Sequence, residues 1–203
     1  MKPLLILYAT RQGQTRRIAE HIQAAIRDRG HTARLRNLRE IREPFSLERY
    51  DGAILAASVH IGRHEPELVH FVKRHREELD KVPTAFLSVS LSEAGAEDPS
   101  RSEADRAKAT ADVQRTIHAF LDRTGWRPRR VRAVAGALLY SKYNFFVRFV
   151  MKQVAKRSAM GTDTSQDYEF TDWTAVDRFV DDVLSDHAAH TAARDVPRAR
   201  APA

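Results

Sequence analysis

Residues 4–26 read LLILYATRQGQTRRIAEHIQAAI, in which an apolar run, a short polar loop and a periodic pattern follow one another. The run at 4–9 is short and continuously apolar, as in a strand that is buried on both faces. Apolar residues then recur at 18, 19, 22, 25 and 26, which is the spacing of an amphipathic helix. This stretch therefore predicts a strand, a loop and a helix in succession.

The same alternation of strand and helix continues along the chain. Further strands are predicted at 32–38, 52–58, 84–89 and 131–138, and further helices at 68–79, at 104–121 and after Thr171. Strands that alternate with helices of this length imply parallel pairing with right-handed crossovers. We therefore expect an α/β fold: a doubly wound, five-stranded parallel sheet in the order 2-1-3-4-5, with helices on both faces.

Length and composition bound the function. The chain has 203 residues, 42% of them hydrophobic and 30% charged, which suits one globular domain. It contains no cysteine, so disulfides, thiolate metal sites and cysteine nucleophiles are excluded. The longest apolar stretch, at 53–59, is far shorter than the roughly 18 residues of a membrane span, and we expect a soluble or peripheral protein.

The rhythm of strands and helices breaks after Leu138. Residues 139–168 separate the last predicted strand from the last predicted helix, for which Thr171 or Asp172 is the expected N-cap. Beyond Asp186 the chain is rich in Ala, Pro and Arg without apolar periodicity. We therefore predict one domain at 1–186, with an insertion at about 139–168, and a disordered tail at 187–203.

The loop Thr10 to Thr15 lies between the first strand and the first helix, at the edge of the sheet where open α/β folds bind ligands. Its backbone N–H groups, the positive end of the helix and the hydroxyls of Thr10 and Thr15 are suited to a phosphate, and Gly13 permits close approach. The chain has neither GxxxxGK(S/T) nor GxGxxG, which leaves a mononucleotide as the ligand. A plain turn capped by Thr15 is the structural alternative.

Several short motifs resemble a known family. The loop Thr10-Arg11-x-Gly13-Gln14-Thr15, together with Ala57-Ser58, Gly136-Ala137-Leu138 and Thr171-Asp172-Trp173, resembles the flavodoxin-like, quinone-dependent protoporphyrinogen oxidases of haem biosynthesis. The resemblance covers roughly residues 3–185 and includes the insertion. Gln12 departs from the threonine that flavodoxins commonly have at this position. The resemblance implies a flavodoxin-like domain, FMN as the cofactor, protoporphyrinogen IX as the substrate and a quinone as the electron acceptor.

The resemblance also implies which residues bind FMN. The phosphate would be held by Thr10, Arg11, Gln12, Gly13, Gln14 and Thr15. The isoalloxazine ring would lie across loops at 58–65 and 88–99, on Ser58, Val59, His60, Ile61, Gly62, Ser88, Val89, Ser90, Leu91 and Ser92. Neither loop contains Trp, Tyr or Phe, so we expect a more open ring face than in an electron carrier. Ordinary loops without a ligand are the alternative, and no catalytic acid or base is identified.

A metal site is not expected. His60 and His64 are four positions apart, but Pro66 disrupts a helix through them and no HExxH motif is present. Nor does the chain contain a GxSxG motif or a Ser-His-Asp arrangement that would indicate a hydrolase.

The formal net charge of +7 comes from one stretch. Between Arg123 and Thr162 the chain has ten Lys or Arg and no Asp or Glu, whereas the remainder has a net charge of −3. Within this stretch, aromatic and aliphatic residues fall at helical spacing beside a row of cations, which is typical of a helix on an anionic membrane surface. Contacts with substrate or membrane are predicted for Tyr140, Lys142, Tyr143, Phe146, Arg148 and Lys152.

Other uses of the insertion stay open. The helix could pack on its own domain or on a second subunit, and a homo-oligomer is then expected. Nucleic acid is disfavoured as a partner, because the aromatic residues belong to a continuous aliphatic stripe and are not spaced for base stacking.

The leading hypothesis is an FMN enzyme on the cytoplasmic face of the inner (cell) membrane. It would oxidise protoporphyrinogen IX to protoporphyrin IX and pass electrons to a membrane quinone, either menaquinone or ubiquinone, with the redox chemistry supplied by the flavin. The alternatives are a flavodoxin-type electron carrier, an NAD(P)H:quinone reductase and a scaffold without flavin. Electron carriers of this type are typically acidic around the flavin, whereas this chain has a basic insertion.

Overall fold

The computed structural model describes residues 2–42, 44–138 and 167–195. Its strands are β1 (Leu4–Ala9), β2 (Ala33–Asn37), β3 (Gly52–His60), β4 (Arg63–His64), β5 (Thr84–Ser90), β6 (Arg130–Ala135), β7 (Ala137–Leu138) and β8 (Tyr168–Glu169). Its α-helices are α1 (Gln14–Asp28), α2 (Pro66–Leu79), α3 (Leu91–Glu97), α4 (Glu103–Thr124) and α6 (Trp173–Asp195). Two 3₁₀ turns, η1 (Leu38–Glu40) and η2 (Leu47–Arg49), lie between β2 and β3.

The main sheet has the predicted topology. Its strands lie in the order β2-β1-β3-β5-β6 with parallel pairing throughout, and β4 adds a short antiparallel hairpin to β3. Because β5 and β6 are the fourth and fifth predicted strands, the expected order 2-1-3-4-5 is confirmed. β7 and β8 form a separate antiparallel ribbon.

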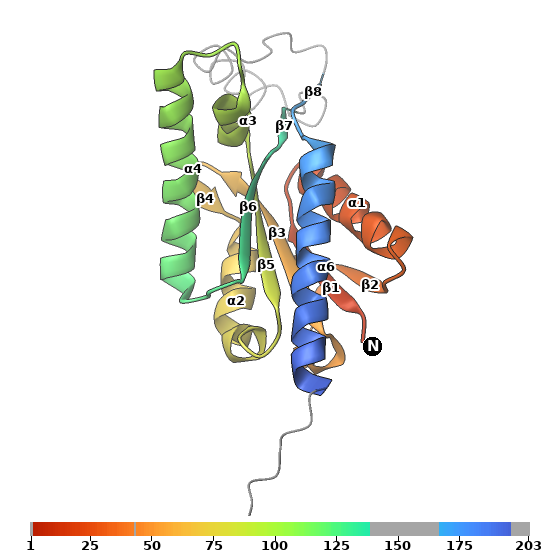
Figure 1. The fold of residues 1–203 in the computed structure, drawn as a ribbon. Coiled ribbons are helices and arrows are strands. Elements are labelled where there is room, and N and C mark those ends of the chain that lie inside the picture. The colour runs from red at the N-terminus through yellow and green to blue at the C-terminus, as the bar shows by residue number, and fades with distance from the viewer. Residues whose placement is uncertain (1, 43, 139–166, 196–203) are drawn as a thin grey trace, which may run out of the picture.

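Helices cover both faces of this sheet (Figure 1). Alternate residues of β1 belong to two cores: Leu4, Ile6 and Tyr8 pack with α1 and α6, whereas Leu5 and Leu7 pack with α2 and α4. The apolar stripe of α1, which the sequence predicts, is fully buried at Ile18, Ile22 and Ile26. Burial of each such side chain contributes about 2 kcal/mol to stability.

The fifth predicted strand, 131–138, is interrupted at Gly136. β6 ends at Ala135, and the Gly136 N–H donates to the Ser90 carbonyl at 3.0 Å. The carbonyl of Gly136 accepts from the N–H of Phe170 at 3.1 Å, so the chain on either side of residues 139–166 pairs at this edge of the sheet.

The prediction of a disordered tail from residue 187 is wrong for residues 187–195, because α6 continues to Asp195. His187 is 1% exposed, so the helix is still packed against the rest of the fold at this position. Asp186, the residue before His187, accepts two hydrogen bonds from Arg130. They come from Nε at 2.5 Å and from Nη2 at 3.0 Å. These contacts and the high helix propensity of alanine stabilise the end of α6, although the sequence there has no apolar periodicity. Residues 196–203 lie outside the described ranges.

None of the helices within the described ranges has the length and apolar content that crossing a bilayer requires.

Candidate functional site

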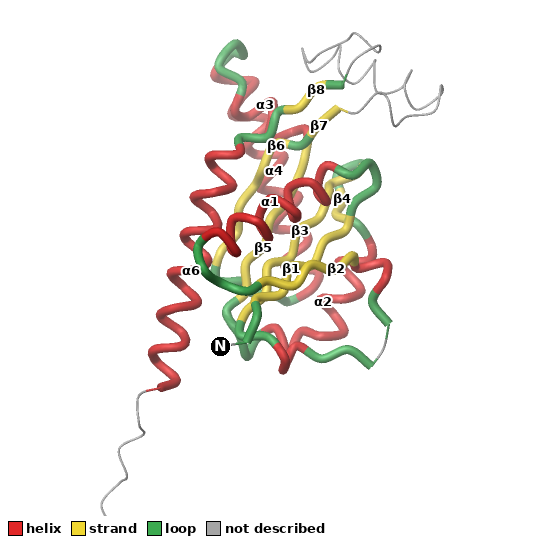
Figure 2. Tube along the Cα trace, turned by 90° about the vertical axis from the view of Figure 1, so that its right-hand side faces the viewer, coloured by secondary structure: helices red, strands yellow, loops and turns green. Residues whose placement is uncertain are grey.

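The carboxyl ends of β1, β3 and β5 meet at one edge of the sheet. Ala9 is in register with Ala57, and Ala57 with Ser88, so the segments that follow these residues are neighbours. Figure 2 shows α3, β7 and β8 at this end of the sheet, with the N-terminus at the opposite end. The predicted phosphate and ring segments are thus brought to the edge where ligands bind in open α/β folds.

The loop between β1 and α1 has the geometry of a phosphate cradle. Gly13 is the N-cap of α1 with φ 105°, a value that strongly favours glycine, and its N–H donates to the hydroxyl of Thr10 at 3.0 Å. No side chain caps the helix, and its first turn contains no acidic residue. A Cβ at Gly13 would meet nothing within 4 Å, so the loop is open on that side.

The plain-turn alternative requires Thr15 to cap the helix, and it does not. Its side chain is buried, and its hydroxyl has no hydrogen-bond partner within the described part of the chain. A buried polar group without a partner is costly, which is a feature expected where a ligand supplies the missing acceptor. The free helix N-terminus and this hydroxyl together fit a phosphate group.

The side chain of Gln14 is already engaged. Its amide nitrogen donates to Glu169 at 2.6 Å and to the hydroxyl of Thr171 at 2.9 Å, and Arg17 also contacts Glu169 at 3.3 Å. Gln14 therefore supports the loop with its side chain, and only its backbone N–H is left for a ligand. Gln12 is half-buried in the same loop.

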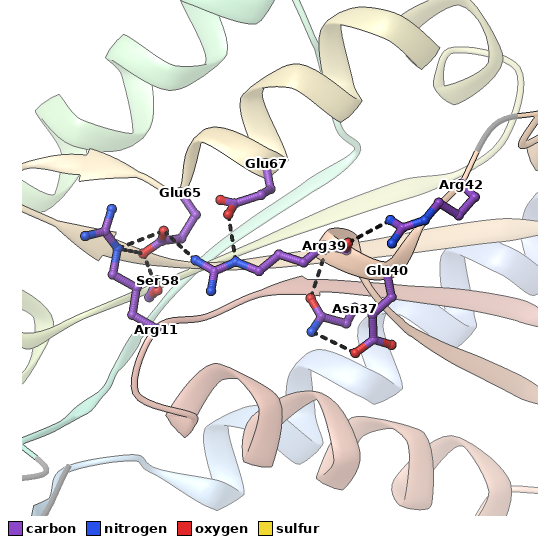
Figure 3. Close-up of polar contacts among 8 residues, drawn as sticks. All are labelled: Arg11, Asn37, Arg39, Glu40, Arg42, Ser58, Glu65 and Glu67. Carbon is purple, nitrogen blue, oxygen red and sulfur yellow. Dashed lines mark hydrogen bonds and ion pairs between the residues drawn. The ribbon is translucent and has the colours of Figure 1, made fainter.

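Arg11 is joined to a residue that the sequence analysis did not include. Its Nε donates to both carboxylate oxygens of Glu65 at 3.0 Å, and the hydroxyl of Ser58 donates to the same carboxylate at 3.1 Å. Arg39 lies 3.9 Å from Glu65 and donates to Glu67 at 2.7 Å (Figure 3). Nothing in the sequence signals the pairing of Arg11 with Glu65, because 54 positions separate them.

The first ring segment forms a tight hairpin. Ser58, Val59 and His60 end β3, and Ile61 and Gly62 make the turn into β4 with φ 49° and 67°. Ile61 is the only non-glycine residue with positive φ in the described ranges, and it is 89% exposed.

The second ring segment differs from the predicted loop at 88–99. Ser88, Val89 and Ser90 belong to β5, whereas Leu91 and Ser92 open α3. The helix forms because the Ser90 hydroxyl caps it by accepting from the N–H of Glu93 at 3.2 Å.

The two ring segments line one cavity of about 390 Å³. It is lined by Val59, Gly62, Ser88, Ser90 and Ser92, and on its other side by Asp112, Val113, Arg115, Thr116 and Ala119 of α4. Its volume is in the range of small-molecule sites. The contribution of α4 was missed, because its periodic pattern indicates only a packed helix.

His64 is a neutral core residue. It lies between the rings of Phe86 and Phe120, with centroids 5.1 and 5.0 Å away, and its Nε2 is 2.9 Å from the hydroxyl of Ser88. Burial lowers the pKa of His64 to about 4. No cluster of His, Asp and Glu in the described ranges could hold a metal ion.

Glu93, on α3 directly after the second ring segment, has a raised pKa. Burial is the main cause, the charge of Glu97 adds to it, and the charge of Arg132 opposes it. This carboxyl group therefore holds a proton to higher pH than an exposed glutamate.

The predicted contacts in the insertion cannot be placed. Tyr140, Lys142, Tyr143, Phe146, Arg148 and Lys152 all lie outside the described residues.

Comparison with known proteins gives matches in sequence. A flavodoxin-domain family model matches residues 5–165. Protoporphyrinogen IX dehydrogenase (quinone) of Escherichia coli K12 is 35% identical over 179 residues, which are 88% of this chain and 93% of that protein. The protein of the same name from Leishmania major is 32% identical over 180 residues, covering 88% of this chain and 73% of that protein.

Among solved structures, oxidised flavodoxin 1 of Bacillus cereus gives a TM-score of 0.47 at 16% identity, covering 90% of this chain and 97% of that chain. The K13G mutant of Fusobacterium nucleatum flavodoxin bound to flavin mononucleotide gives 0.48 at 13% identity, covering 93% and 96%.

Proposed function

This chain belongs to the flavodoxin-domain family of quinone-dependent protoporphyrinogen IX dehydrogenases, and from that membership we propose that it oxidises protoporphyrinogen IX with a quinone as electron acceptor. The observation that carries the proposal is that the phosphate cradle and the ring segments that line the cavity follow or end neighbouring strands at the same end of the sheet, because a flavin needs both a phosphate site and a place for its ring. Hydrogen removed from the porphyrinogen macrocycle would leave as quinol.

The family supports a flavin as the cofactor, and we propose FMN. A phosphate on the N-terminus of α1 accounts for the open cradle at Gly13 and for the buried hydroxyl of Thr15, which has no partner in the part of the chain that the structure describes. The chain has no GxGxxG motif, which is the loop that binds the pyrophosphate of a dinucleotide. When bound, the flavin accepts hydride from the substrate and passes electrons on.

The protein's own part is to hold and orient. The loop Thr10 to Thr15 would bind the phosphate, and the cavity between the ring segments and α4 would hold the ring, with the hydroxyls of Ser90 and Ser92 and the exposed tip at Ile61 along its edge. The ring segments contain no aromatic residue, so a large planar substrate would have access to the ring.

The family names favour this function over the two redox alternatives. The curated relatives at 35% and 32% identity are named as dehydrogenases of protoporphyrinogen IX with quinone, not as electron carriers or as NAD(P)H reductases. The match covers 93% of the E. coli relative, so the similarity to that enzyme extends over nearly its whole length.

We place the enzyme at the cytoplasmic face of the cell membrane as a peripheral protein. Membrane quinones are lipid-soluble, and the five basic residues between 142 and 157, with no acidic residue among them, suit an anionic lipid surface. Deletion of residues 142–157 would then abolish cosedimentation with anionic liposomes and leave FMN bound. Loss of FMN as well would contradict this placement of the segment.

The function is tested with purified protein, FMN and a quinone in detergent. We expect protoporphyrin fluorescence to appear only when porphyrinogen, flavin-loaded protein and quinone are all present. Absence of quinone-dependent turnover would refute the proposal. Rapid reduction of the flavin by NADPH in place of porphyrinogen would favour the reductase alternative.

A further inference from the structure

We propose that Glu65 is a positioning residue of the cofactor site, which acts through Arg11 to hold the phosphate loop against the β3–β4 hairpin. The inference rests on the proposed function, because it concerns the binding of FMN at this edge of the sheet. It assigns a role to a residue that is not among those named as FMN contacts in the phosphate loop or in the two ring segments.

The Glu65 carboxylate joins segments that are distant in sequence. Its side chain is completely buried, and it accepts hydrogen bonds from the phosphate loop through Arg11 and from β3 through Ser58. Buried carboxylates need such partners, because removal from water disfavours the charged form. Arg11 and Ser58 each lie at one of the two places where we expect the ends of FMN to bind.

The direction of this carboxylate is informative. Glu65 is the N-cap of α2, a position from which an acceptor side chain usually binds the first N–H groups of the helix. It makes no such bond. The carboxylate is used instead on Arg11, across the edge of the sheet.

The pairing with Glu65 also determines which N–H groups of Arg11 are available to a ligand. The bond to Glu65 uses only its Nε, and no hydrogen bond is recorded for its two terminal amino groups within the described ranges. The side chain is 44% exposed, so these groups are accessible to an anion. A guanidinium that is held at its Nε and is accessible at its terminal amino groups can donate hydrogen bonds to an anion in a fixed direction.

A second arginine completes the network without touching the loop. Arg39 lies near Glu65 and is bonded to Glu67, and its backbone N–H donates to the side chain of Asn37 at 3.1 Å. Figure 3 shows the guanidinium groups of Arg11 and Arg39 on either side of the Glu65 carboxylate. Glu67 thus provides a matched control, being a carboxylate of the same network that contacts Arg39 and not Arg11.

The experiment is a double-mutant cycle read by FMN affinity. The Kd is measured from the quenching of flavin fluorescence in wild type, Glu65→Gln, Arg11→Gln and the double variant, with unfolding of the flavin-free proteins measured in parallel. We expect each single variant to raise the Kd at least tenfold and the double variant to be no weaker than the weaker single one. Glu67→Gln is expected to stay within twofold of wild type.

The outcomes separate the possible failures. If wild type binds no FMN, the proposed function fails. If wild type binds FMN but the Kd of Glu65→Gln is within twofold of it, only the role of Glu65 is refuted. If Glu65→Gln weakens binding equally with and without Arg11, Glu65 acts on the fold and the proposal is wrong. Should Glu65→Gln not fold, Arg11→Lys keeps the charge without the fixed donor geometry, and an unchanged Kd there also overturns the proposal.

Discussion

The side-chain amide of Gln14 donates to the hydroxyl of Thr171 at 2.9 Å, across 157 positions of sequence. The same hydroxyl donates to the carbonyl of Ala135 at 2.8 Å. Thr171 therefore joins the phosphate loop to the end of β6. It is also the residue directly before Asp172, which caps the first turn of α6. The insertion leaves and returns between these last two elements, so this contact fixes the loop to the part of the fold that carries the insertion.

Replacement of Thr171 by valine should destabilise the protein by about 1–3 kcal/mol. Valine keeps the shape of the buried side chain but removes the acceptor for Gln14 and the donor for Ala135. Urea unfolding of the flavin-free protein measures the effect as a lower midpoint. In the control Thr110→Val, an exposed hydroxyl bonded within α4 is lost, and we expect a change within about 0.5 kcal/mol. Equal effects of the two substitutions would contradict the special role of Thr171.

The strands and the loop between β1 and α1 could be predicted because their signals are local. An apolar run, a glycine between two threonines and a helical period lie within residues 4–26, and the structure keeps that order. The end of α6 could not be predicted, because the burial of His187 and the pairing of Asp186 with Arg130 depend on segments from other parts of the chain. The hydrogen bonds of Glu65 and Thr171 likewise depend on the packing of distant segments.

Replacement of Thr15 by valine should weaken FMN binding without destabilising the flavin-free protein. The hydroxyl is buried and has no partner among the described residues, so its removal relieves an unsatisfied group and should not destabilise the free protein. If it donates to the phosphate, its loss raises the FMN Kd by about tenfold or more, as for hydrogen bonds to charged groups. Fluorescence titration and urea unfolding measure the two effects.

The variant Thr116→Val provides a comparison with Thr15→Val at the other end of the site, and the hydroxyl it removes is bonded to the carbonyl of Asp112 within α4. Thr116 lines the cavity from the helix side, so this variant tests the ring end of the site and not the phosphate end. A loss of stability in Thr15→Val, with FMN affinity unchanged, would show that the hydroxyl serves the fold and not the ligand.

His64 should make the protein sensitive to acid. Its pKa is about 4 when folded and near 6.5 when unfolded, so below pH 6.5 the unfolded state binds the proton first. Stability is therefore lost as the pH falls from about 6.5 to about 4, by on the order of 3 kcal/mol in total.

The substitution His64→Gln removes this titration while keeping an amide near Ser88. We expect the loss of stability between pH 7 and pH 4.5 to be smaller in His64→Gln than in wild type, measured by urea unfolding at each pH. The exposed His70→Gln should follow the wild-type pH profile. Parallel profiles for wild type and His64→Gln would contradict the burial of a neutral imidazole.

The cavity shows where sequence reasoning about the ring site ends. Ser58 to Gly62 and Ser88 to Ser92 could be predicted as neighbours, because both lie at the carboxyl ends of adjacent parallel strands. The wall formed by α4 could not, because the exposed side of a helix carries no sign of what lies opposite it.

Replacement of Ile61 by asparagine should have opposite effects on stability and on FMN binding. Ile61 and Gly62 form a two-residue turn with positive φ at both positions, for which Asn-Gly is strongly preferred. A β-branched residue at φ 49° costs on the order of 1 kcal/mol, and asparagine relieves this strain. The flavin-free variant should therefore unfold at higher urea concentration.

An isoleucine that is 89% exposed despite its strain is expected to serve a contact, which we place at the edge of the ring. Its loss should raise the FMN Kd several-fold, whereas Val131→Thr, at another exposed apolar position, should leave the Kd unchanged. An Ile61→Asn variant that is more stable and binds FMN as tightly as wild type would show that the hairpin tip does not touch the flavin.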